Sequence, residues 1–345
     1  MLKGLLHKVV AGENLVEKEA AEAMELIMSG MATPAQIASL LTALHLKGET
    51  EDEITGFARV MRSRATPVTY SHPMLIDTCG TGGDGLHTFN ISTTVAFILA
   101  GADMKVAKHG NRSVSSSCGS ADVLEALGVN LDLSPKSLAA CLEEIGFAFL
   151  FAPALHTAMK HAAEPRRELG FRTIFNVLGP LTNPAGAQYQ VLGVYHPRLT
   201  RLLAGVLCRL GTERAFVIHG DGGLDEISPS GPALICEVKD GKVNEYYLDP
   251  CELGIPKASI ASLTGGSTQE NAVITKEILT GKHGPQRDTV LLNTAPGLVA
   301  CGKAKSFTEG MQIAAQIIDS GLAMRKVEEL VTFSRKHAQK QVSGL

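Results

Sequence analysis

The strongest constraint on the fold is a regular alternation of strand-like and helix-like segments that begins after Thr66-Pro67. The runs PMLIDTCG and MKVAKHG are short and apolar, as buried strands are, and the helical segments STTVAFILAGA and SADVLEALGV follow them. FAFLFA, QYQVLGVYH, AFVIHG and ALICEV have the same strand character, with helical segments such as RLTRLLAGVLCRLG between some of them. This alternation predicts an α/β fold with a mainly parallel central sheet flanked by helices.

The first 65 or so residues predict a separate, all-helical unit. Thr33-Pro34-Ala35-Gln36 has the form of a capping box with proline at the first helical position. Two later helical segments, TAMKHAAEPRRELG and RTIFNVLG, interrupt the strand–helix alternation, and we expect them to fold back onto the N-terminal helices. The predicted organisation is a discontinuous small helical domain of residues 1–70 plus about 152–183, and an α/β domain of residues 71–151 plus 184–345.

Composition excludes several classes of function. A net charge of −3 over 345 residues gives no bulk positive field for nucleic acid or acidic membranes. No apolar run approaches the roughly 18 residues of a membrane span, and the N-terminus lacks the unbroken apolar core of a signal peptide. The seven cysteines are scattered without a C-x-x-C pair, which predicts reduced thiols. We therefore expect a cytoplasmic protein with no nucleic-acid or membrane partner.

The loop DTCGTGGDG contains Gly80-x-Gly82-x-x-Gly85, which fits the dinucleotide-binding fingerprint. In that fold the last glycine lies within the opening helix, whereas here LHTFN intervenes before a helix start at Asn90 or Ser92. A carboxylate at Asp84 would also repel a bare pyrophosphate. The second strand ends in Lys108-His109 where a dinucleotide enzyme places an acid for the ribose. The pattern therefore argues against NAD.

Two hydroxyl-rich segments predict a phosphate ligand instead. Asn90-Ile91-Ser92-Thr93-Thr94 places hydroxyls and free N–H groups at a helix N-terminus, which is an anion site. Lys108 and Arg112 add positive charge, and the turn from Ser113 to Ser120 adds further hydroxyls. Both segments follow strands of the predicted parallel sheet, so both should face one crevice. A ligand with two separated phosphate groups would fill it.

A third loop follows AFVIHG and contains Asp225-Glu226 after Gly222-Gly223. Adjacent carboxylates in a glycine-bearing loop after a strand suit Mg²⁺, which binds a few carboxylates, waters and substrate phosphates. The sequence therefore predicts a Mg²⁺ cofactor beside the phosphate ligand.

Several motifs together resemble the anthranilate phosphoribosyltransferase family. They are GTGGD (80–84), NIST (90–93), KHGNRSVSSSCGSADVLEALG (108–128), RRELGFRTIFNVLGPLTNP (166–184) and GLDEIS (223–228). ENAVI, RDTVLLNTA and the final helices extend the likeness over nearly the whole chain. The resemblance implies a glycosyltransferase of tryptophan biosynthesis that transfers 5-phosphoribosyl from phosphoribosyl pyrophosphate to the amine of anthranilate. It also implies the nucleoside phosphorylase type of fold and a homodimer joined through the helical domains, and it allows association with anthranilate synthase.

The resemblance also implies site residues. For phosphoribosyl pyrophosphate they are Gly80, Gly83, Asp84, Thr88, Asn90, Ile91, Ser92, Thr93, Lys108, His109, Gly110, Asn111, Arg112, Ser113, Val114, Ser115, Ser116 and Ser120. For anthranilate they are Gly80, Asn111 and Arg166, and for magnesium Ser92, Asp225 and Glu226. No side chain is assigned a catalytic role, because positioning and electrostatics suffice for an acceptor amine that is neutral at pH 7. The chain departs from the family pattern at Thr157, where proline is expected, and at Glu164-Pro165, where Pro-Val is commoner.

Three alternatives remain at the level of sequence. A nucleoside phosphorylase of the same fold would cleave a glycosidic bond with phosphate, but Asp225-Glu226 and the double phosphate site favour a diphosphate donor. A non-enzymatic protein of this fold that binds nucleic acid would need a basic surface stripe and loss of the glycine loop. An NAD-dependent dehydrogenase would need a shorter loop between Gly85 and the helix.

Overall fold

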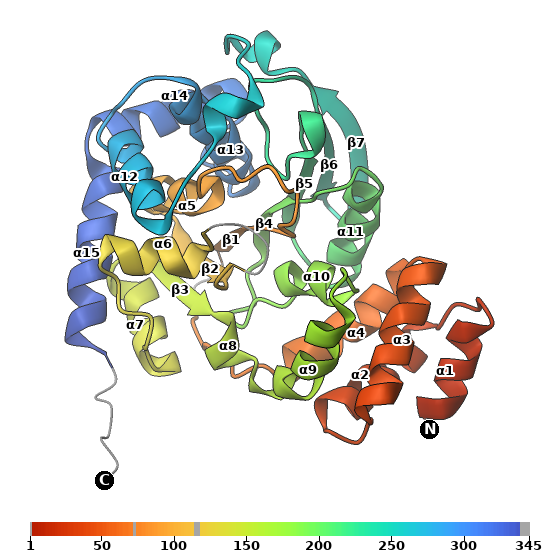
Figure 1. The fold of residues 1–345 in the computed structure, drawn as a ribbon. Coiled ribbons are helices and arrows are strands. Elements are labelled where there is room, and N and C mark those ends of the chain that lie inside the picture. Colours follow the sequence, from red (N-terminus) through yellow and green to blue (C-terminus); the bar gives the residue numbers. More distant parts are fainter. Residues whose placement is uncertain (1, 72–73, 114–117, 339–345) are drawn as a thin grey trace.

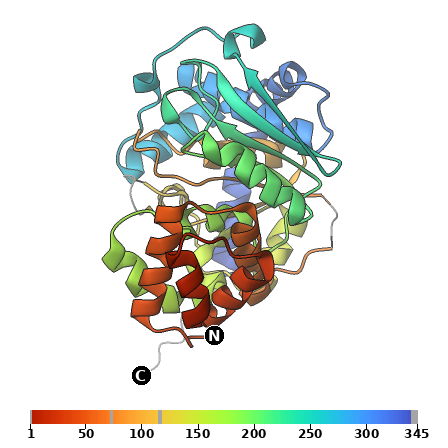
Figure 2. The same ribbon diagram turned by 90° about the vertical axis from the view of Figure 1, so that its right-hand side faces the viewer.

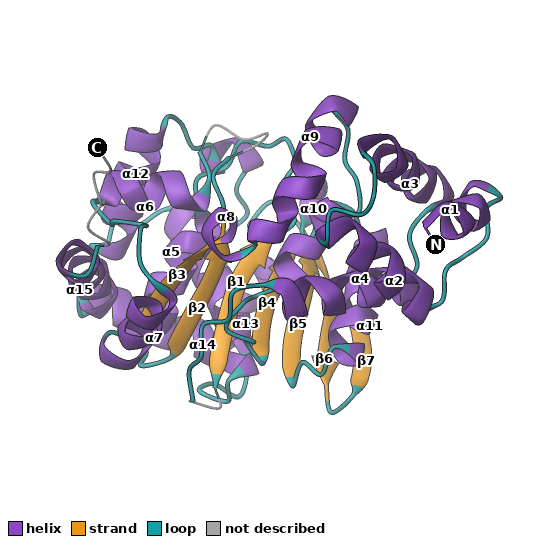
Figure 3. Ribbon diagram, turned by 90° about the horizontal axis from the view of Figure 1, so that it is seen from below, coloured by secondary structure: helices purple, strands orange, loops and turns teal. Residues whose placement is uncertain are grey.

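The protein is described here from a computed structural model, which covers residues 2–71, 74–113 and 118–338. Its centre is one seven-stranded sheet with the order β3-β2-β1-β4-β5-β6-β7 (Figure 3). The strands are β1 (Leu75–Gly80), β2 (Lys105–Gly110), β3 (Phe147–Phe151), β4 (Tyr189–Gly193), β5 (Arg214–His219), β6 (Ala233–Lys239) and β7 (Lys242–Leu248). The first five are parallel, while β6 and β7 are antiparallel to their neighbours. The predicted mainly parallel sheet is confirmed.

Helices cover both faces of the sheet because its strands are apolar on both sides. On β5, Phe216 and Ile218 belong to one hydrophobic cluster, whereas Ala215 and Val217 belong to the other. The first cluster includes residues of α5 (Ile91–Gly101), α6 (Ser120–Leu127), α7 (Pro135–Glu144), α12 (Thr268–Leu279), α13 (Pro285–Ala300), α14 (Phe307–Asp319) and α15 (Leu322–Lys336). The second includes α11 (Arg198–Arg209), which packs on β5, β6 and β7. Within the described residues, no helix combines the length and apolarity needed to cross a bilayer.

The N-terminal helices form a group beside the sheet (Figures 1 and 2). They are α1 (Leu2–Val10), α2 (Glu17–Met28), α3 (Pro34–Lys47) and α4 (Glu51–Arg64). The predicted capping box is confirmed, since Thr33 Oγ1 accepts from the Gln36 N–H at 3.3 Å and Gln36 Oε1 accepts from the Thr33 N–H at 3.0 Å. The later helices are α8 (Ala152–Leu155), α9 (Lys160–Leu169) and α10 (Phe175–Leu178). Of these, α9 contacts α2 and α3, and α10 contacts α4.

The order of the strands fixes where a ligand can bind. From β1 the chain proceeds to β2 and β3 on one side of the sheet, and from β4 it proceeds to β5 and β6 on the other. Adjacent strands whose connections diverge in this way leave a crevice outside their carboxyl ends. The loops that follow β1, β2 and β5 carry the predicted functional residues, so the fold directs them to the same edge of the sheet.

Candidate active site

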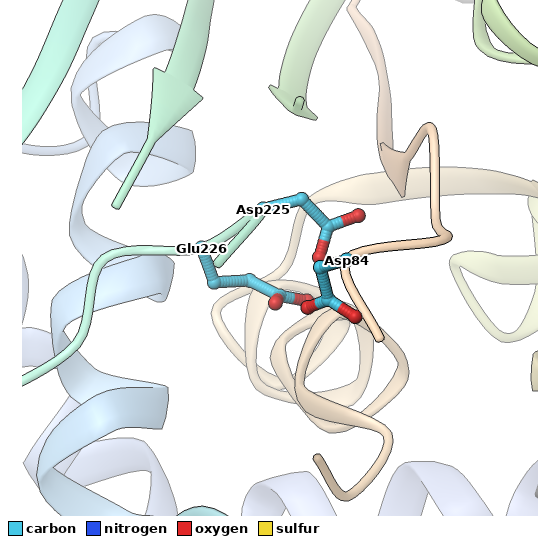
Figure 4. Close-up of side chains that lie close together, drawn as sticks. All are labelled: Asp84, Asp225 and Glu226. Atoms are coloured by element: carbon cyan, nitrogen blue, oxygen red, sulfur yellow. The ribbon is translucent and has the colours of Figure 1, made fainter. Parts of the chain in front are cut away.

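Three carboxylates from two distant loops meet at this crevice. Asp84 comes from the glycine loop after β1, whereas Asp225 and Glu226 come from the loop between β5 and β6 (Figure 4). One carboxylate oxygen of each residue lies within 4.8 Å of the other two. The resemblance placed Asp225 and Glu226 on magnesium and Asp84 on the phosphoribosyl donor. The structure brings all three carboxylates together.

Glycines allow the acidic loop to approach the ends of three strands. A Cβ atom built on Gly80 would lie 2.3 Å from Asp225 Oδ2, on Gly193 1.7 Å from the Asp225 carbonyl oxygen, and on Gly220 2.0 Å from the Glu226 carbonyl oxygen. Any side chain at these positions would displace the loop. Gly193 and Gly220 were not predicted as site residues, although each follows an apolar strand run in the sequence.

Hydrogen bonds hold the acidic loop in this position. The N–H group of Gly82 donates to Asp225 Oδ2 at 3.0 Å, which ties the glycine loop to the acidic loop. Asn293 of α13 holds the backbone of Ile227, the residue after Glu226, because its Nδ2 donates to the Ile227 carbonyl at 2.7 Å and its Oδ1 accepts from the Ile227 N–H at 2.9 Å. Asn293 was also not predicted as a site residue.

The electrostatics of the cluster fit a divalent cation. Burial raises the pKa of Glu226 well above its usual range, and the charges of Asp225 and Asp84 raise it further, while Lys108 acts in the opposite direction. Burial and the charge of Asp225 also raise the pKa of Asp84. Glu226 Oε2 is buried and has no hydrogen-bond partner in the described part of the chain. Oxygen ligands that repel one another at this spacing are what Mg²⁺ or a similar hard cation would bind.

Lys108 supplies a buried positive charge beside the carboxylates. Its side chain is almost fully buried, and Nζ donates to the Thr78 carbonyl and, at 3.2 Å, to Ser92 Oγ. Burial lowers the pKa of Lys108, and the charge of Asp77 opposes that shift. Ser92 lines a small cavity together with Asp225 and Glu226. The structure thus places the predicted Ser92 next to the acidic cluster and the predicted Lys108 directly behind it.

The start of α5 forms one wall of the site. α5 begins at Ile91, in agreement with the predicted helix start. Asn90 Nδ2 donates to the Cys118 carbonyl at 3.1 Å, whereas Asn90 Oδ1 and Thr93 Oγ1 are buried without a hydrogen-bond partner among the described residues. Thr88 forms an isolated antiparallel bridge with Thr264. The Thr93 hydroxyl can donate to an anion at this helix N-terminus, whereas Asn90 Oδ1 can only accept a hydrogen bond.

The loop after β2 is folded around the start of α6. Asp122 Oδ2 accepts from the N–H groups of Ser113 and Gly119 at 3.1 and 2.8 Å, and Ser120 Oγ donates to the Asn111 carbonyl at 3.2 Å. The guanidinium of Arg112 is paired with Asp122 at 3.0 Å and, through both terminal nitrogens, with Glu125 at 2.5 and 2.8 Å. Its predicted positive charge is therefore neutralised by α6. The predicted residues Val114, Ser115 and Ser116 lie outside the described residues.

His109 faces away from Lys108 because successive side chains of a strand alternate. Its Nδ1 lies 3.2 Å from the Gly179 carbonyl, and its ring centre lies 5.0 Å from that of His156. Burial, and then the proximity of His156, lower the pKa of His109 to about 3. His109 is therefore neutral at physiological pH and serves packing on this side of β2. Gly110 is the last residue of β2, and a Cβ built on it would lie 2.3 Å from the Ser120 hydroxyl oxygen.

Arg166 is a guanidinium without an anionic partner in the described part of the chain. It lies on α9 with its charged end 4.8 Å from the centre of the Phe175 ring. Burial lowers its pKa, but an arginine keeps its charge at neutral pH. Pro165 is buried inside α9, while Glu164 is exposed and 3.9 Å from Arg167. The departure from the family pattern at Glu164-Pro165 therefore leaves the predicted arginine half-buried and unpaired.

A second cation near the carboxylates, Arg172, was not predicted. Its guanidinium lies 4.1 Å from the centre of the Tyr195 ring and against Gly83 of the glycine loop. No local pattern identified Arg172 as a site residue, because it lies in a segment that was interpreted as helical.

Comparison with protein families places most of the chain in two known domains. Residues 72–324 match the glycosyl transferase family, a/b domain, and residues 3–65 match the glycosyl transferase family, helical bundle domain. Two similar proteins are the anthranilate phosphoribosyltransferases of Pelotomaculum thermopropionicum and Moorella thermoacetica. The first is 61% identical over 97% of this chain and 97% of its own length, and the second is 58% identical over 96% and 98%.

Solved structures agree with the sequence comparison. The anthranilate phosphoribosyltransferase of Thermus thermophilus superposes with a TM-score of 0.91 at 44% identity, covering 96% of this chain and 99% of that protein. The enzyme of Saccharomyces cerevisiae, in complex with PRPP and Mg, superposes with a TM-score of 0.89 at 28% identity, covering 97% and 98%. The likeness thus extends over both parts of the fold and includes a relative solved with a phosphoribosyl donor and a metal.

Proposed function

The chain belongs to the anthranilate phosphoribosyltransferase family, and we propose that the crevice between its glycine loop and its acidic loop is the catalytic centre. As a member of this family it transfers the 5-phosphoribosyl group of phosphoribosyl pyrophosphate to the amine of anthranilate and releases pyrophosphate. The observation that carries the assignment of the centre is the meeting of Asp84, Asp225 and Glu226 at the ends of β1 and β5, beside Lys108.

Asp84, Asp225 and Glu226 would hold Mg²⁺, with the hydroxyl of Ser92 beside them. When bound, Mg²⁺ neutralises the negative charge that develops on the pyrophosphate leaving group. Polar groups of the glycine loop, the start of α5 and the loop after β2 would bind the rest of the donor. These are Gly80, Gly83, Thr88, Asn90, Ile91, Thr93, Gly110, Asn111, Ser113 and Ser120, with Arg112 if it leaves its ion pairs.

Lys108 is positioned to stabilise the departing charge. Its Nζ is anchored on the Thr78 carbonyl and Ser92 Oγ, so the ammonium does not have to reorganise during the reaction. No general base is required to activate the acceptor, since an aromatic amine is already neutral at pH 7. The site would act by holding donor and acceptor in line and by stabilising charge.

Arg166 would bind the carboxylate of anthranilate. A guanidinium pairs with a carboxylate through two parallel hydrogen bonds, and Arg166 has no competing acid among the described residues. Its contact with Phe175 restrains the planar group, which leaves less entropy to be lost on binding. Gly80 and Asn111 would complete the acceptor site, and anilines that lack the carboxylate should be poor substrates.

The helical domain would also provide a dimer interface. α9 and α10 contact the N-terminal helices, which supports grouping residues 152–183 with residues 1–70 as one unit. The homodimer, a cytoplasmic location and any association with anthranilate synthase are parts of this proposal. Light scattering of the purified protein tests the first, since a monomer of 36.5 kDa is well separated from a dimer of twice that mass.

The direct test of function follows the fluorescence of anthranilate with phosphoribosyl pyrophosphate and Mg²⁺. We expect a loss of fluorescence that requires protein, donor and metal together. If folded protein leaves the fluorescence unchanged but releases the base from a nucleoside in the presence of phosphate, the donor assignment is wrong and the protein is a phosphorylase.

A further inference from the structure

Arg172 lies on a short connection whose backbone is fixed at both ends. α9 ends at Leu169, and its cap residue Gly170 adopts a left-handed conformation with φ 66°. Three residues after Gly170, the N–H of Thr173 donates to Asn176 Oδ1 at 3.0 Å, which fixes the chain before α10. The side chain of Arg172 therefore extends from this connection in a defined direction, toward the ends of β1 and β4.

Its guanidinium lies against both an aromatic ring and the glycine loop. The guanidinium carbon lies 4.1 Å from the centre of the Tyr195 ring. A Cβ built on Gly83 would lie 2.7, 2.9 and 3.0 Å from Nη2, Cζ and Nε of Arg172, respectively. Because these three distances are nearly equal, a face of the guanidinium, and not an edge, lies against the position that a side chain of Gly83 would occupy. The absence of a side chain at Gly83 is what makes room for it.

The charge of Arg172 is not neutralised by an ion pair. Within residues 2–71, 74–113 and 118–338 no carboxylate lies within 4.0 Å of its nitrogens, although Asp84, the neighbour of Gly83, is close enough to feel its field. The carboxylates of Asp84, Asp225 and Glu226 converge on one another instead. A cation bound there would balance the negative charge of the three carboxylates. Arg172 would then face the same crevice as a positive group whose charge those carboxylates no longer offset.

We propose that Arg172 is a further donor-binding residue, which holds the pyrophosphate of phosphoribosyl pyrophosphate against the glycine loop. This inference rests on the proposed function. A metal-bound pyrophosphate at the acidic cluster must lie beside Gly83 and Asp84, within reach of the guanidinium that covers them. The planar group can donate two hydrogen bonds to phosphate oxygens while its face stays on Tyr195.

The test compares Arg172→Gln, Arg172→Lys and the control Arg167→Gln. Arg167 is an exposed arginine of α9 whose only ion pair is with Glu164 at 3.9 Å in the described chain. A charge-assisted contact to phosphate predicts at least about a tenfold rise in the KM for phosphoribosyl pyrophosphate in Arg172→Gln. The KM for anthranilate should stay within about twofold, Arg172→Lys should recover part of the loss, and Arg167→Gln should match the wild type.

Calorimetric titration with pyrophosphate and Mg²⁺ separates this inference from the proposed function, because it requires no turnover. Arg172→Gln should bind pyrophosphate at least about tenfold more weakly than the wild type. Wild-type protein that binds pyrophosphate but transfers nothing would contradict the function and leave the role of Arg172 standing. Unchanged pyrophosphate binding in Arg172→Gln, or a rise in the KM for anthranilate alone, would overturn the inference.

Discussion

Replacing Gly193 by alanine tests whether the close approach of the acidic loop creates the site. Gly193 ends β4, and an added Cβ would lie 1.7 Å from the carbonyl oxygen of Asp225, where ordinary contact begins near 3.4 Å. The backbone of Asp225 cannot rotate away as a side chain could. The loop must therefore retreat by more than an ångström, and the carboxylates of Asp225 and Glu226 must move with it away from Asp84.

The magnitude follows from this displacement. Misplacing reacting groups by about 1 Å can cost roughly 100-fold in rate, so kcat/KM should fall by about that factor or more. The Mg²⁺ concentration that gives half of the maximal rate should rise, since the three carboxylates no longer converge. Overpacking of this kind should lower the free energy of unfolding by about 1–3 kcal/mol.

Steady-state kinetics at a series of Mg²⁺ concentrations and urea unfolding measure these effects. Gly4→Ala is the matched control, because Gly4 lies in α1 and a Cβ built on it has no neighbour within 4 Å. That variant should keep full activity and gain about 0.5–1 kcal/mol of stability from the better helix propensity of alanine. A Gly193→Ala protein with normal kcat/KM and a normal Mg²⁺ requirement would refute the steric argument.

Three further predictions concern single side chains. Arg166→Gln should raise the KM for anthranilate roughly 10- to 100-fold with little effect on the KM for phosphoribosyl pyrophosphate, and equal rises in both would contradict its role. Asp225→Asn should raise the Mg²⁺ concentration for half-maximal rate about tenfold, whereas Asp240→Asn, at the exposed β6–β7 turn, should not. Burial lowers the pKa of His109 to about 3, so below pH 6.5 the unfolded chain binds a proton at this residue that the folded chain does not. The stability that this residue contributes is fully present above pH 6.5 and is lost as the pH falls. Between pH 7 and pH 5 this loss amounts to about 2 kcal/mol. The free energy of unfolding of His109→Gln, measured in urea, should therefore fall by about 2 kcal/mol less than that of the wild type over this range. Equal decreases in the two proteins would show that His109 titrates normally.

The sequence allowed β1 to β6 to be predicted, because each of these strands is a short apolar run, and glycine or polar residues mark the loops after those that carry the site. Lys108, Asp225 and Glu226 were recognised in this way, and the structure brings them together. Strand β7 was missed, although Asp240-Gly241 between two runs is a hairpin signal. Both residues have positive φ, 50° and 70°, as the corresponding turn requires.

The missed contacts depend on pairing between segments that are far apart in the chain. Asp84 and Asp225 are separated by more than a hundred residues, and they meet because β4 lies between β1 and β5. Arg172 and Tyr195 meet because the link between α9 and α10 lies against the loops that follow β1 and β4. No local pattern encodes such proximity, since it follows from the order of strands and the packing of helices.

The distribution of charge around the crevice has a functional consequence. The negative groups, Asp84, Asp225 and Glu226, belong to loops of the sheet, whereas Arg166 and Arg172 lie on α9 and on the link to α10. Neither guanidinium has an ion pair within the described chain, so each retains its charge for a ligand. A metal-bound diphosphate would connect Arg172 to the sheet, and the carboxylate of the acceptor would occupy Arg166. Substrates would then supply the ionic contacts between the sheet loops and the α9–α10 segment, and the order of that segment should increase when both substrates bind, as measured by hydrogen exchange.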